Sequence, residues 1–334
     1  MKIQICNKRL EELIKLAEFH GAFMVSLCAL NFLFCIVAIF GNVLVITALW
    51  KASSVPESLK RLFLSLAVSD LAVGLSVQPM HGAIIAVILN NVESRSYNFQ
   101  ASLCPTIVTI YLSSAYLFSV ASFLSIVFTA VDRLLALSFH LRYHELVTCK
   151  RVEAVIGIMW LTSFLVTVVY IALPNYNDIV AVVLELLGIS VTTAAYFKIY
   201  RIARYHQNKI HCQRQVAIDV ETLNTARVKR SAYNAFFVYA LFLACYIPNV
   251  FCGILLNVFT SSMAFIIAFY ITIFLIYLNS SVNILVYCWR FREIRLIVKT
   301  TFCKMICQLS EQESPRTTAE ISTVQLVREI PTKT

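Results

Sequence analysis

Residues 231–251 read SAYNAFFVYALFLACYIPNVF and residues 274–289 read FLIYLNSSVNILVYCW, and no Asp, Glu, Lys or Arg occurs anywhere from 231 to 289. About 20 helical residues cross the roughly 30 Å hydrocarbon core of a bilayer. The stretch is therefore long enough for two membrane spans, joined by a short turn near 257–262.

The polar residues inside this pair of spans predict a bundle that moves. Asn279, Asn283 and Tyr287 recur every four residues, so they form a stripe on one helix face. In the first span of the pair, Pro248 lacks a backbone N–H, which predicts a kink beside Asn249. Polar groups in hydrocarbon are costly, so both features should face the bundle interior.

Composition excludes a soluble domain. Hydrophobic residues make up 59% of the 334, charged residues only 14%, and mean hydropathy is +0.77, which is typical of polytopic membrane proteins. The net charge of +10 is scattered between apolar segments, so we expect no nucleic-acid partner. Residues 2–20 lack the charged, apolar and small-residue order of a signal peptide, so we expect the first span to be retained.

Five further windows complete seven spans and predict an all-α membrane protein, a seven-transmembrane-helix bundle. They are 19–50, 62–92 (interrupted only by Asp70), 96–131, 154–177 and 179–197 (interrupted only by Glu185). Lys and Arg concentrate in the connectors after the first, third and fifth spans, whereas the opposite connectors carry only Arg95. The positive-inside rule then predicts an extracellular N-terminus and a cytoplasmic tail at the plasma membrane.

The two ends of the chain flank the bundle expected at 21–288. In the arm 1–20, Leu10, Leu13 and Ala17 share a helical spacing with Ile14, which indicates either an amphipathic helix on the outer surface or a frayed lead-in. Residues 289–302 alternate basic and apolar positions, as in a short amphipathic eighth helix at the membrane lipid. The tail 303–334 is rich in Ser, Thr and Glu and is expected to be disordered, with Cys303 and Cys307 placed for palmitoylation.

Short motifs occur in all seven spans. In chain order they are Gly41-Asn42-Val43, Leu66-Ala67-Val68-Ser69-Asp70, Asp132-Arg133-Leu134, Trp160, Tyr196, Cys245-Tyr246-Ile247-Pro248 and Asn283-Ile284-Leu285-Val286-Tyr287. Together they resemble the markers of rhodopsin-like (class A) G-protein-coupled receptors. The resemblance implies a receptor that senses an extracellular ligand and activates a heterotrimeric G protein, with arrestin and a receptor kinase as further partners.

The resemblance also implies roles for individual residues. Arg133 would face the G protein when the sixth helix swings outward, and Asp70 would bind an allosteric sodium ion, although an Asp held neutral by hydrogen bonds is the alternative. The implied switch residues are Asp132, Arg133, Tyr196, Tyr246, Pro248, Asn283 and Tyr287. The implied sodium ligands are Asp70, Asn42, Ser122, Asn279, Ser280 and Asn283, and no other cofactor is expected.

The chain departs from the family pattern at several switch positions. Leu134 replaces a Tyr, Tyr246 a Trp, Ile284 a Pro, and Gly188 stands where a Pro is common. Residues 227–230 (RVKR) offer no carboxylate to hold Arg133, which favours a weakly restrained inactive state with basal activity.

The extracellular cysteines do not follow the family pattern either. The connector at 174–178 has no Cys, so the family's usual disulfide to Cys104 cannot form; Cys104 is either a free thiol or paired with Cys6. That short connector and the missing proline are similar to the branch of melanocortin, cannabinoid and lysophospholipid receptors.

By match to the family, the pocket would be lined by His81, Ala115, Tyr116, Ser119, Glu185, Tyr246, Asn249, Ile273 and Tyr277. Ala115 stands where amine receptors carry an Asp, which disfavours a monoamine. The mostly apolar and aromatic set favours a lipid-like small molecule or a short peptide. Glu185 faces either this pocket and a cationic ligand or the neighbouring helices as a protonated acid.

Two rival functions remain open, a signalling-silent pseudoreceptor and a seven-span transporter or channel. His140 and His144 lie one helical turn apart, but with no third ligand nearby a solvated surface is favoured over a metal site. The sequence carries no Gly-rich phosphate loop, metalloprotease pair or Ser-centred elbow, so we expect no enzyme.

Overall fold

The computed structural model describes residues 2–91, 106–139, 142–173, 177–213, 239–256 and 262–304, and every regular element within them is a helix. In chain order the helices are α1 (Lys2–Phe19), α2 (Gly21–Lys51), α3 (Glu57–Ala72), η1 (Val73–Val77), α4 (Gln78–Asn91), α6 (Thr106–Ser138), α7 (Tyr143–Leu146), α8 (Cys149–Ala172), α9 (Asn177–Gln213), Tyr239–Leu256, α11 (Met263–Arg290) and 292–304.

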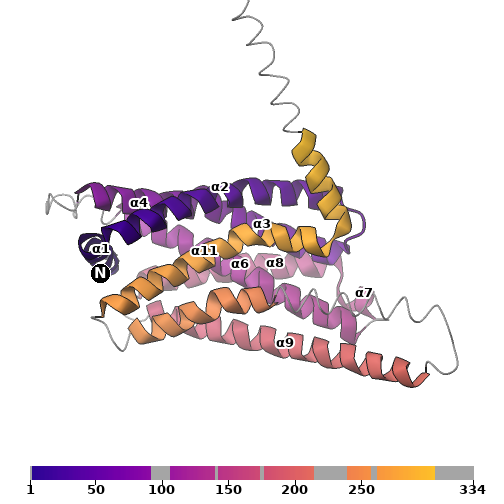
Figure 1. Cartoon of the computed structure of the whole chain (residues 1–334). Coiled ribbons are helices and arrows are strands. Elements are labelled where there is room, and N and C mark those ends of the chain that lie inside the picture. The colour runs from indigo at the N-terminus through magenta and orange to yellow at the C-terminus, as the bar shows by residue number, and fades with distance from the viewer. Residues whose placement is uncertain are drawn as a thin grey trace, which may run out of the picture.

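The seven predicted spans are confirmed. In the described residues, seven helices are long and apolar enough to cross a bilayer: α2, the continuous run Glu57–Asn91, α6, α8, Ile179–Ile202 within α9, Tyr239–Leu256, and Met263–Trp289 within α11. They form one bundle, with helix 292–304 turning away at the end opposite α1 (Figure 1). The protein is an all-α membrane protein with a seven-transmembrane-helix bundle.

Several helix ends differ from the charge-free windows. The second span begins at Glu57 rather than at 62, α9 continues to Gln213 beyond the predicted 197, and α6 begins at Thr106, whereas the predicted start at 96 lies outside the described residues. The reason is physical: absence of charge locates the segment within hydrocarbon, but a helix continues into water as long as its backbone bonds are made. The windows therefore found the spans and missed their polar extensions.

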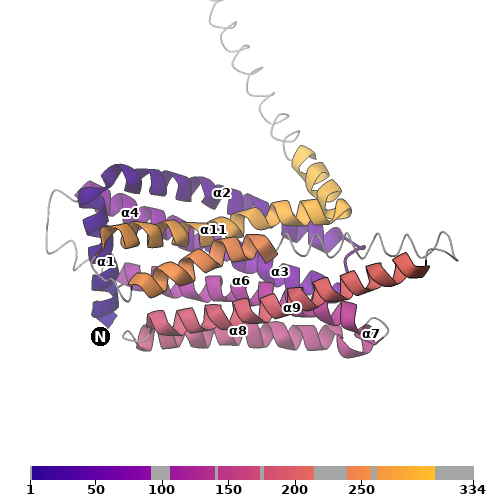
Figure 2. The same ribbon diagram turned by 60° about the horizontal axis from the view of Figure 1, so that its bottom comes forward.

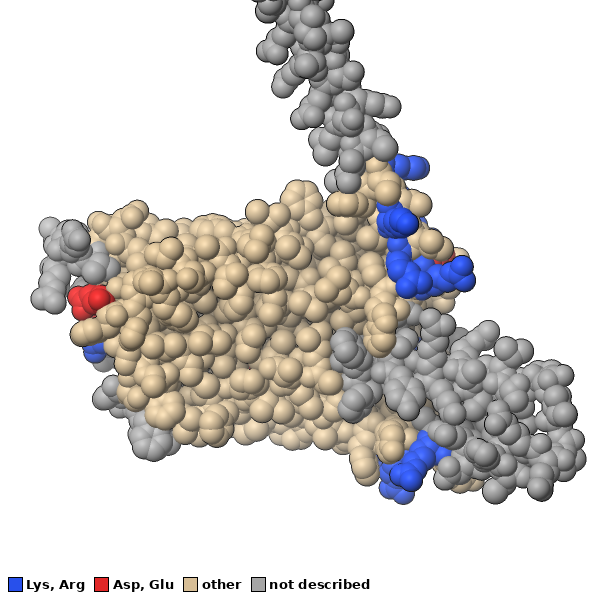
Figure 3. All heavy atoms as spheres, in the orientation of Figure 1, with Lys and Arg blue, Asp and Glu red and all other residues tan. Residues whose placement is uncertain are grey.

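The face of the bundle seen in Figure 3 carries no charged side chain along most of its length. Figure 3 shows a broad surface without Lys, Arg, Asp or Glu, while Lys and Arg gather at the end that carries helix 292–304 and the end of α9. An apolar belt bounded by charge is the surface expected of a bilayer-spanning bundle.

The N-terminal arm is helical and lies across one end of the bundle (Figure 2). Leu10, Leu13 and Ala17 are buried, and Leu16 between them is fully buried. Their stripe packs against α2, α4, α6 and α11. Of the two expectations for this arm, the amphipathic helix is correct, but its apolar face covers the bundle rather than a lipid surface.

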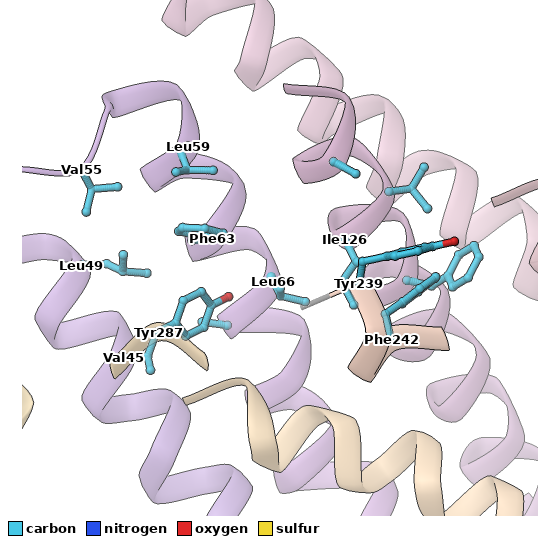
Figure 4. Close-up of a cluster of buried hydrophobic side chains, with 14 of the residues drawn as sticks. Val45, Leu49, Val55, Leu59, Phe63, Leu66, Ile126, Tyr239, Phe242 and Tyr287 are labelled. Carbon is cyan, nitrogen blue, oxygen red and sulfur yellow. The ribbon is translucent and has the colours of Figure 1, made fainter. Parts of the chain in front are cut away.

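Two apolar clusters fill the bundle, one at each end. The cluster at the α1 end joins α1, α2 and α4 to α6 and α11, and includes Leu16, Met24 and Ile85. The cluster at the other end joins α2 and α3 to α6, α9, Tyr239–Leu256 and helix 292–304. Figure 4 shows part of the second cluster, with Phe63 and Tyr287 on one side and Tyr239 and Phe242 on the other.

The second span contains a π-helical turn, η1, that the sequence windows did not predict. The N–H of Gln78 bonds the carbonyl of Val73, five residues back, immediately before Pro79. A π turn inserts an extra residue and so rotates the helix that follows it. Gln78 and His81, on the first turn of α4, are consequently buried in the bundle.

Gly188 explains how α9 approaches α6 without the proline that the family pattern would place there. A Cβ atom at this position would overlap the ring of Phe123 and lie 3.3 Å from Val127. The absence of a side chain therefore permits close contact between two helices that line the candidate site.

Candidate functional site

A cavity of about 160 Å³ lies within the bundle near α1. Its wall contains all nine residues predicted for the ligand pocket: His81, Ala115, Tyr116, Ser119, Glu185, Tyr246, Asn249, Ile273 and Tyr277. A single water needs only about 10–15 Å³ by the same measure, so the space suits a small molecule. Glu185 is among the lining residues, and whether it meets a cationic ligand or is a protonated acid stays a prediction.

The wall also contains residues that the sequence did not single out. Leu10 and Leu13 reach it from α1, and Tyr111, Tyr170 and Tyr270 add aromatic surface. Tyr111 stands four residues before Ala115, so its place on the same helix face could have been predicted from spacing. The two leucines had no such signal, because their position depends on how α1 docks.

The aromatic side chains of the wall are held to one another. The Tyr111 and Tyr277 hydroxyl oxygens are 2.8 Å apart in a hydrogen bond, and the rings of Tyr116 and Tyr170 are stacked. His81 stacks on Tyr111 with ring centroids 5.3 Å apart and meets the edge of Tyr277. Asn249 donates to the Thr272 hydroxyl at 3.2 Å. The wall is thus ordered by contacts within the protein itself.

Aromatic residues also form the boundary between the cavity and the opposite end of the bundle. Phe123 and Tyr246 line the cavity, and each packs on Phe242, with ring centroids 5.5 and 4.8 Å apart. Tyr239, Phe242 and Tyr246 share one face of their helix, and Tyr239 stacks on Tyr196 of α9 at 4.7 Å. The series is a continuous packed connection from the cavity to the other end.

Three of the residues predicted for a sodium site, Ser122, Ser280 and Asn283, meet at Asp70, which is fully buried. Ser122 donates to its Oδ1 at 2.8 Å and Asn283 to its Oδ2 at 2.6 Å, while the Ser280 hydroxyl is also within hydrogen-bonding reach. Asn42 donates to the carbonyls of Ala38 and Ser280. The carboxylate is therefore bonded by hydroxyl and amide groups from α6 and α11, and Asn42 joins α2 to the same part of α11.

Two polar atoms of this group lack a hydrogen-bond partner among the described residues, Oδ1 of Asn42 and Nδ2 of Asn279. An anionic oxygen, hydroxyl oxygens and a spare amide oxygen are suitable ligands for a hard cation. The donor set accordingly fits a sodium ion, although it also fits a protonated acid held by hydrogen bonds. Both readings of Asp70 remain compatible with the geometry.

The switch residues lie at the end opposite the cavity. Arg133 bonds Asp132 through Nε at 3.0 Å and through a second guanidinium nitrogen, and Asp132 accepts from the Tyr143 hydroxyl at 2.7 Å. Tyr143 bonds Ser58 in turn, and burial is the largest cause of the raised pKa of this phenol. Among the described residues, the carboxylate that pairs with Arg133 is thus that of Asp132, the preceding residue in the same helix.

Tyr196 and Tyr287 line a small cavity of about 30 Å³ together with Phe63 and Asn283. Tyr287 packs edge-on against Phe63, with ring centroids 4.9 Å apart. Pro248 lies within the helix Tyr239–Leu256, and the kink expected there stays a prediction.

Some predicted features lie outside the described residues. Cys104, Cys307 and residues 227–230 belong to undescribed segments, and neither the side chain of Cys6 nor a pair formed by His140 and His144 is described. Cys303 is exposed in the last turn of helix 292–304. No cluster of metal-ligating His, Cys, Asp or Glu occurs in the part of the chain that was described.

Comparison with known proteins agrees with this arrangement. The family model for the seven-transmembrane receptors of the rhodopsin family matches residues 41–181, which include Gly41, Asp70 and Arg133. An adenosine receptor A2b from Gallus gallus is 25% identical over 330 residues, covering 84% of this chain and 89% of the relative.

Two other relatives extend the comparison. A melanocortin receptor 4 from Danio rerio is 25% identical over 281 residues, covering 80% of this chain and 81% of its own. An adenosine receptor A3 from Canis lupus familiaris is 33% identical over 129 residues, or 39% of this chain and 37% of its own. The melanocortin relative fits the expected branch, but adenosine receptors match as well, so placement within the family stays a prediction.

Seven spans in one bundle, the residues around Asp70 and at Arg133, and these matches agree: the chain is a multi-pass membrane protein and is similar to the rhodopsin-like (class A) family of G-protein-coupled receptors.

Proposed function

We propose that the protein binds an extracellular ligand in the cavity near α1 and, in response, activates a heterotrimeric G protein at the opposite end. The observation that carries this proposal is the aromatic series Tyr246, Phe242 and Tyr239, which joins the cavity wall to Tyr196. The sixth span, Tyr239–Leu256, carries Tyr246. A ligand that packs differently against Tyr246 in two positions of this span would shift the equilibrium between those positions.

The distribution of charge supports the proposed orientation. Lys and Arg gather at the end of helix 292–304, away from α1 (Figure 3). Cytoplasmic connectors carry such an excess, so the α1 end faces the outside of the plasma membrane and the arm 1–20 is extracellular. The bundle, whose last helix α11 ends at Arg290, is followed by the eighth helix, which spans 292–304 rather than the expected 289–302. Cys303, in the last turn of that helix, is positioned for a lipid anchor.

The cavity wall favours a ligand that is largely apolar. Ile273, Leu10 and the tyrosines dominate it, and the described wall contains no Lys or Arg. Among the α6 residues that line the cavity, Ala115 included, none is an acid that could pair with a monoamine. A lipid-like small molecule or a short peptide fits best. The names of the relatives point to adenosine and to melanocortin, two different ligands, so similarity alone selects neither.

A weak restraint on the inactive state is part of the proposal. Arg133 pairs with Asp132 on its own helix, and no carboxylate from another helix is bonded to it among the described residues. Moving the sixth span, Tyr239–Leu256, away from the end of α6 therefore breaks no described ion pair between these two helices. We expect measurable ligand-free signalling.

Asp70 supplies a second control point. Asp70, Ser122 and the spare oxygen of Asn42 would hold a sodium ion, with Asn279, Ser280 and Asn283 around it. The ion would neutralise the buried carboxylate and hold α2, α6 and α11 together. Arrestin and a receptor kinase are further proposed partners of the active form.

The test is ligand-free activation of a panel of G proteins in cells at matched surface expression. Replacing Arg133 by Ala should reduce the basal signal to that of mock-transfected cells, because the guanidinium is the proposed G-protein contact. Lys150→Ala is the matched control, since Lys150 is an exposed cation at the same end.

A signal that persists in Arg133→Ala would contradict the proposed coupling. A silent wild type would remove the weak-restraint hypothesis and favour a pseudoreceptor. Ion flux that depends on Asp70 and Glu185, measured in parallel, would instead support a channel or transporter.

A further inference from the structure

Three contiguous polar side chains lie buried between the first and second spans: Asn31 of α2, and Gln78 and His81 of α4. Their exposed fractions are 1%, 0% and 2%. Four of their polar atoms lack a hydrogen-bond partner among the described residues: Asn31 Oδ1, both amide atoms of Gln78, and His81 Nε2. Buried polar groups are usually paired, so this concentration calls for an explanation.

The bonds of Asn31 determine which nitrogen of His81 carries the proton. Nδ2 of Asn31 lies 3.1 Å from the backbone carbonyl oxygen of Gln78, where an amide oxygen would be repelled, so the amide orientation is fixed. The same Nδ2 lies 3.2 Å from Nδ1 of His81. Because an amide nitrogen can only donate, Nδ1 must accept, and the proton of the neutral ring is therefore on Nε2.

His81 is the member of this trio that lines the cavity. Its ring is fixed by the stack on Tyr111 at 5.3 Å and by the edge of Tyr277 at 5.7 Å. Nδ1 is bonded on the Asn31 side, which leaves Nε2–H as a buried donor without a partner among the described residues. A buried, unpaired donor in a cavity wall strongly favours any ligand that supplies an acceptor there.

We propose that Nε2–H of His81 is the polar anchor of the cavity and selects ligands that carry a hydrogen-bond acceptor, such as a ketone, amide or ester carbonyl, on an apolar body. Asn31 is the positioning residue, because it fixes the tautomer without lining the cavity. The acceptor is uncharged, since the described wall holds no Lys or Arg to pair with a carboxylate. This inference rests on the proposed ligand cavity and names its ligand chemistry.

The first test reads the tautomer directly. Nitrogen-15 NMR of the histidine rings in the full chain, in lipid nanodiscs, distinguishes protonated from unprotonated nitrogens. The His81 ring is identified as the signal that is lost in His81→Phe or shifted in Asn31→Leu. We expect a neutral ring protonated at Nε2; protonation at Nδ1 overturns the proposal even if the Phe variant fails to fold.

The second test compares probes that share a phenylbutyl body: 4-phenylbutan-2-one, butylbenzene and 4-phenylbutan-2-amine. Binding is measured by the thermal unfolding midpoint of the nanodisc-embedded chain. One added hydrogen bond from a buried donor should make the ketone bind about five- to tenfold more tightly than butylbenzene. A ketone with no advantage in the wild type overturns the proposal.

Variants identify the residue that makes the ketone bind more tightly than butylbenzene. His81→Phe keeps a ring for the Tyr111 stack but lacks the donor, so it should abolish the ketone advantage and leave the amine's affinity unchanged. Asn31→Leu should reduce the advantage, because the ring can then adopt either tautomer. Ser76→Ala, whose hydroxyl bonds Ala72 within the same span at 2.6 Å, is the control and should retain it. An undiminished ketone advantage in His81→Phe overturns the assignment.

These measurements are independent of signalling. Loss of the ketone preference in His81→Phe, with the ring protonated at Nε2, supports the anchor whether or not Arg133 couples to a G protein. Conversely, G-protein activation that depends on Arg133, together with a ketone preference that does not depend on His81, would leave the proposed function standing and remove this inference.

Discussion

Two buried polar clusters that both include residues of the second span, Glu57–Asn91, differ in how well their polar atoms are paired. Around Asp70, the carboxylate oxygens accept bonds from Ser122 and Asn283. Around Gln78, less than three turns further along the span, both side-chain amide atoms lack a partner among the described residues. The Asp70 carboxylate joins three helices through bonds to both of its oxygens, although Asn42 Oδ1 and Asn279 Nδ2 nearby lack partners among the described residues. The second cluster leaves hydrogen-bonding capacity next to a cavity. Burial alone therefore does not distinguish a structural polar group from one that is available for binding.

The sharpest test of the Asp70 side is Asp70→Leu. The substitution leaves the Ser122 hydroxyl and the Asn283 amide without their acceptor in a dry interior, and each unsatisfied donor costs about 1–3 kcal/mol. We expect a net loss of about 2–4 kcal/mol. The apparent unfolding free energy or the thermal midpoint in nanodiscs measures it.

Ser69→Ala is the control for Asp70→Leu, because Ser69 is equally buried but bonds the carbonyl of Leu66 in its own helix. Exchange of sodium for N-methylglucamine should lower the midpoint of the wild type and leave that of Asp70→Leu unchanged. A midpoint of Asp70→Leu equal to that of the wild type would mean that the bonds around the carboxylate do not stabilise the bundle.

The opposite sign is expected at Gln78. Gln78→Met keeps the shape of the side chain and the backbone carbonyl that binds Asn31, but it removes two buried polar atoms without partners. Removing an unsatisfied polar group of this kind should stabilise the bundle by roughly 1–2 kcal/mol, measured by the same thermal midpoint.

For comparison, Ile85→Met exchanges one fully buried apolar side chain for another in the same helix and should cost less than about 1.5 kcal/mol. If Gln78→Met destabilises the bundle more than Ile85→Met does, the proposed difference between the two clusters is wrong. The amide of Gln78 would then have to be hydrogen-bonded as well as Asp70 is.

A second carboxylate, Glu293, is exposed to water, and its substitution should have the smallest effect. Hydrogen bonds from the Ser54 hydroxyl, and then from the Ser53 and Ser54 backbone, lower the pKa of Glu293 to about 2 from its ordinary 4.5. A lowered folded-state pKa means that its contribution is complete above about pH 4.5 and is lost as pH falls through about 2.

Hydrogen exchange of the Ser53 and Ser54 amides, corrected for the intrinsic rate, checks this. Protection should persist from pH 7 to about 4.5, decline below that value, and be reduced at neutral pH in Glu293→Gln. Arg292→Gln, a neighbouring exposed change, should leave it unaltered. Equal protection in Glu293→Gln and the wild type would show that the hydrogen bonds to Glu293 do not protect the Ser53 and Ser54 amides.

Much of the architecture was available from local sequence. Runs without charge identify segments that can lie in hydrocarbon, because each residue's transfer cost adds along the chain regardless of its neighbours in space. The seven spans were found in this way. The nine cavity residues were found by their match to family positions, which carries over because homologous helices keep the same rotation. The helix ends and the extension of α9 were missed, since they do not depend on hydropathy.

Tertiary structure decided which polar groups meet. The π turn Val73–Val77 rotates α4, and only then do Gln78 and His81 face Asn31. The docking of α1, which brings Leu10 and Leu13 to the cavity, likewise depends on surfaces from helices distant in sequence. The sequence by itself determined that this protein has seven membrane spans that carry receptor-like motifs, because hydropathy and motifs are properties of single segments. Which of its buried polar atoms are satisfied and which remain available for a ligand depends on distances between segments, and folding alone sets those distances.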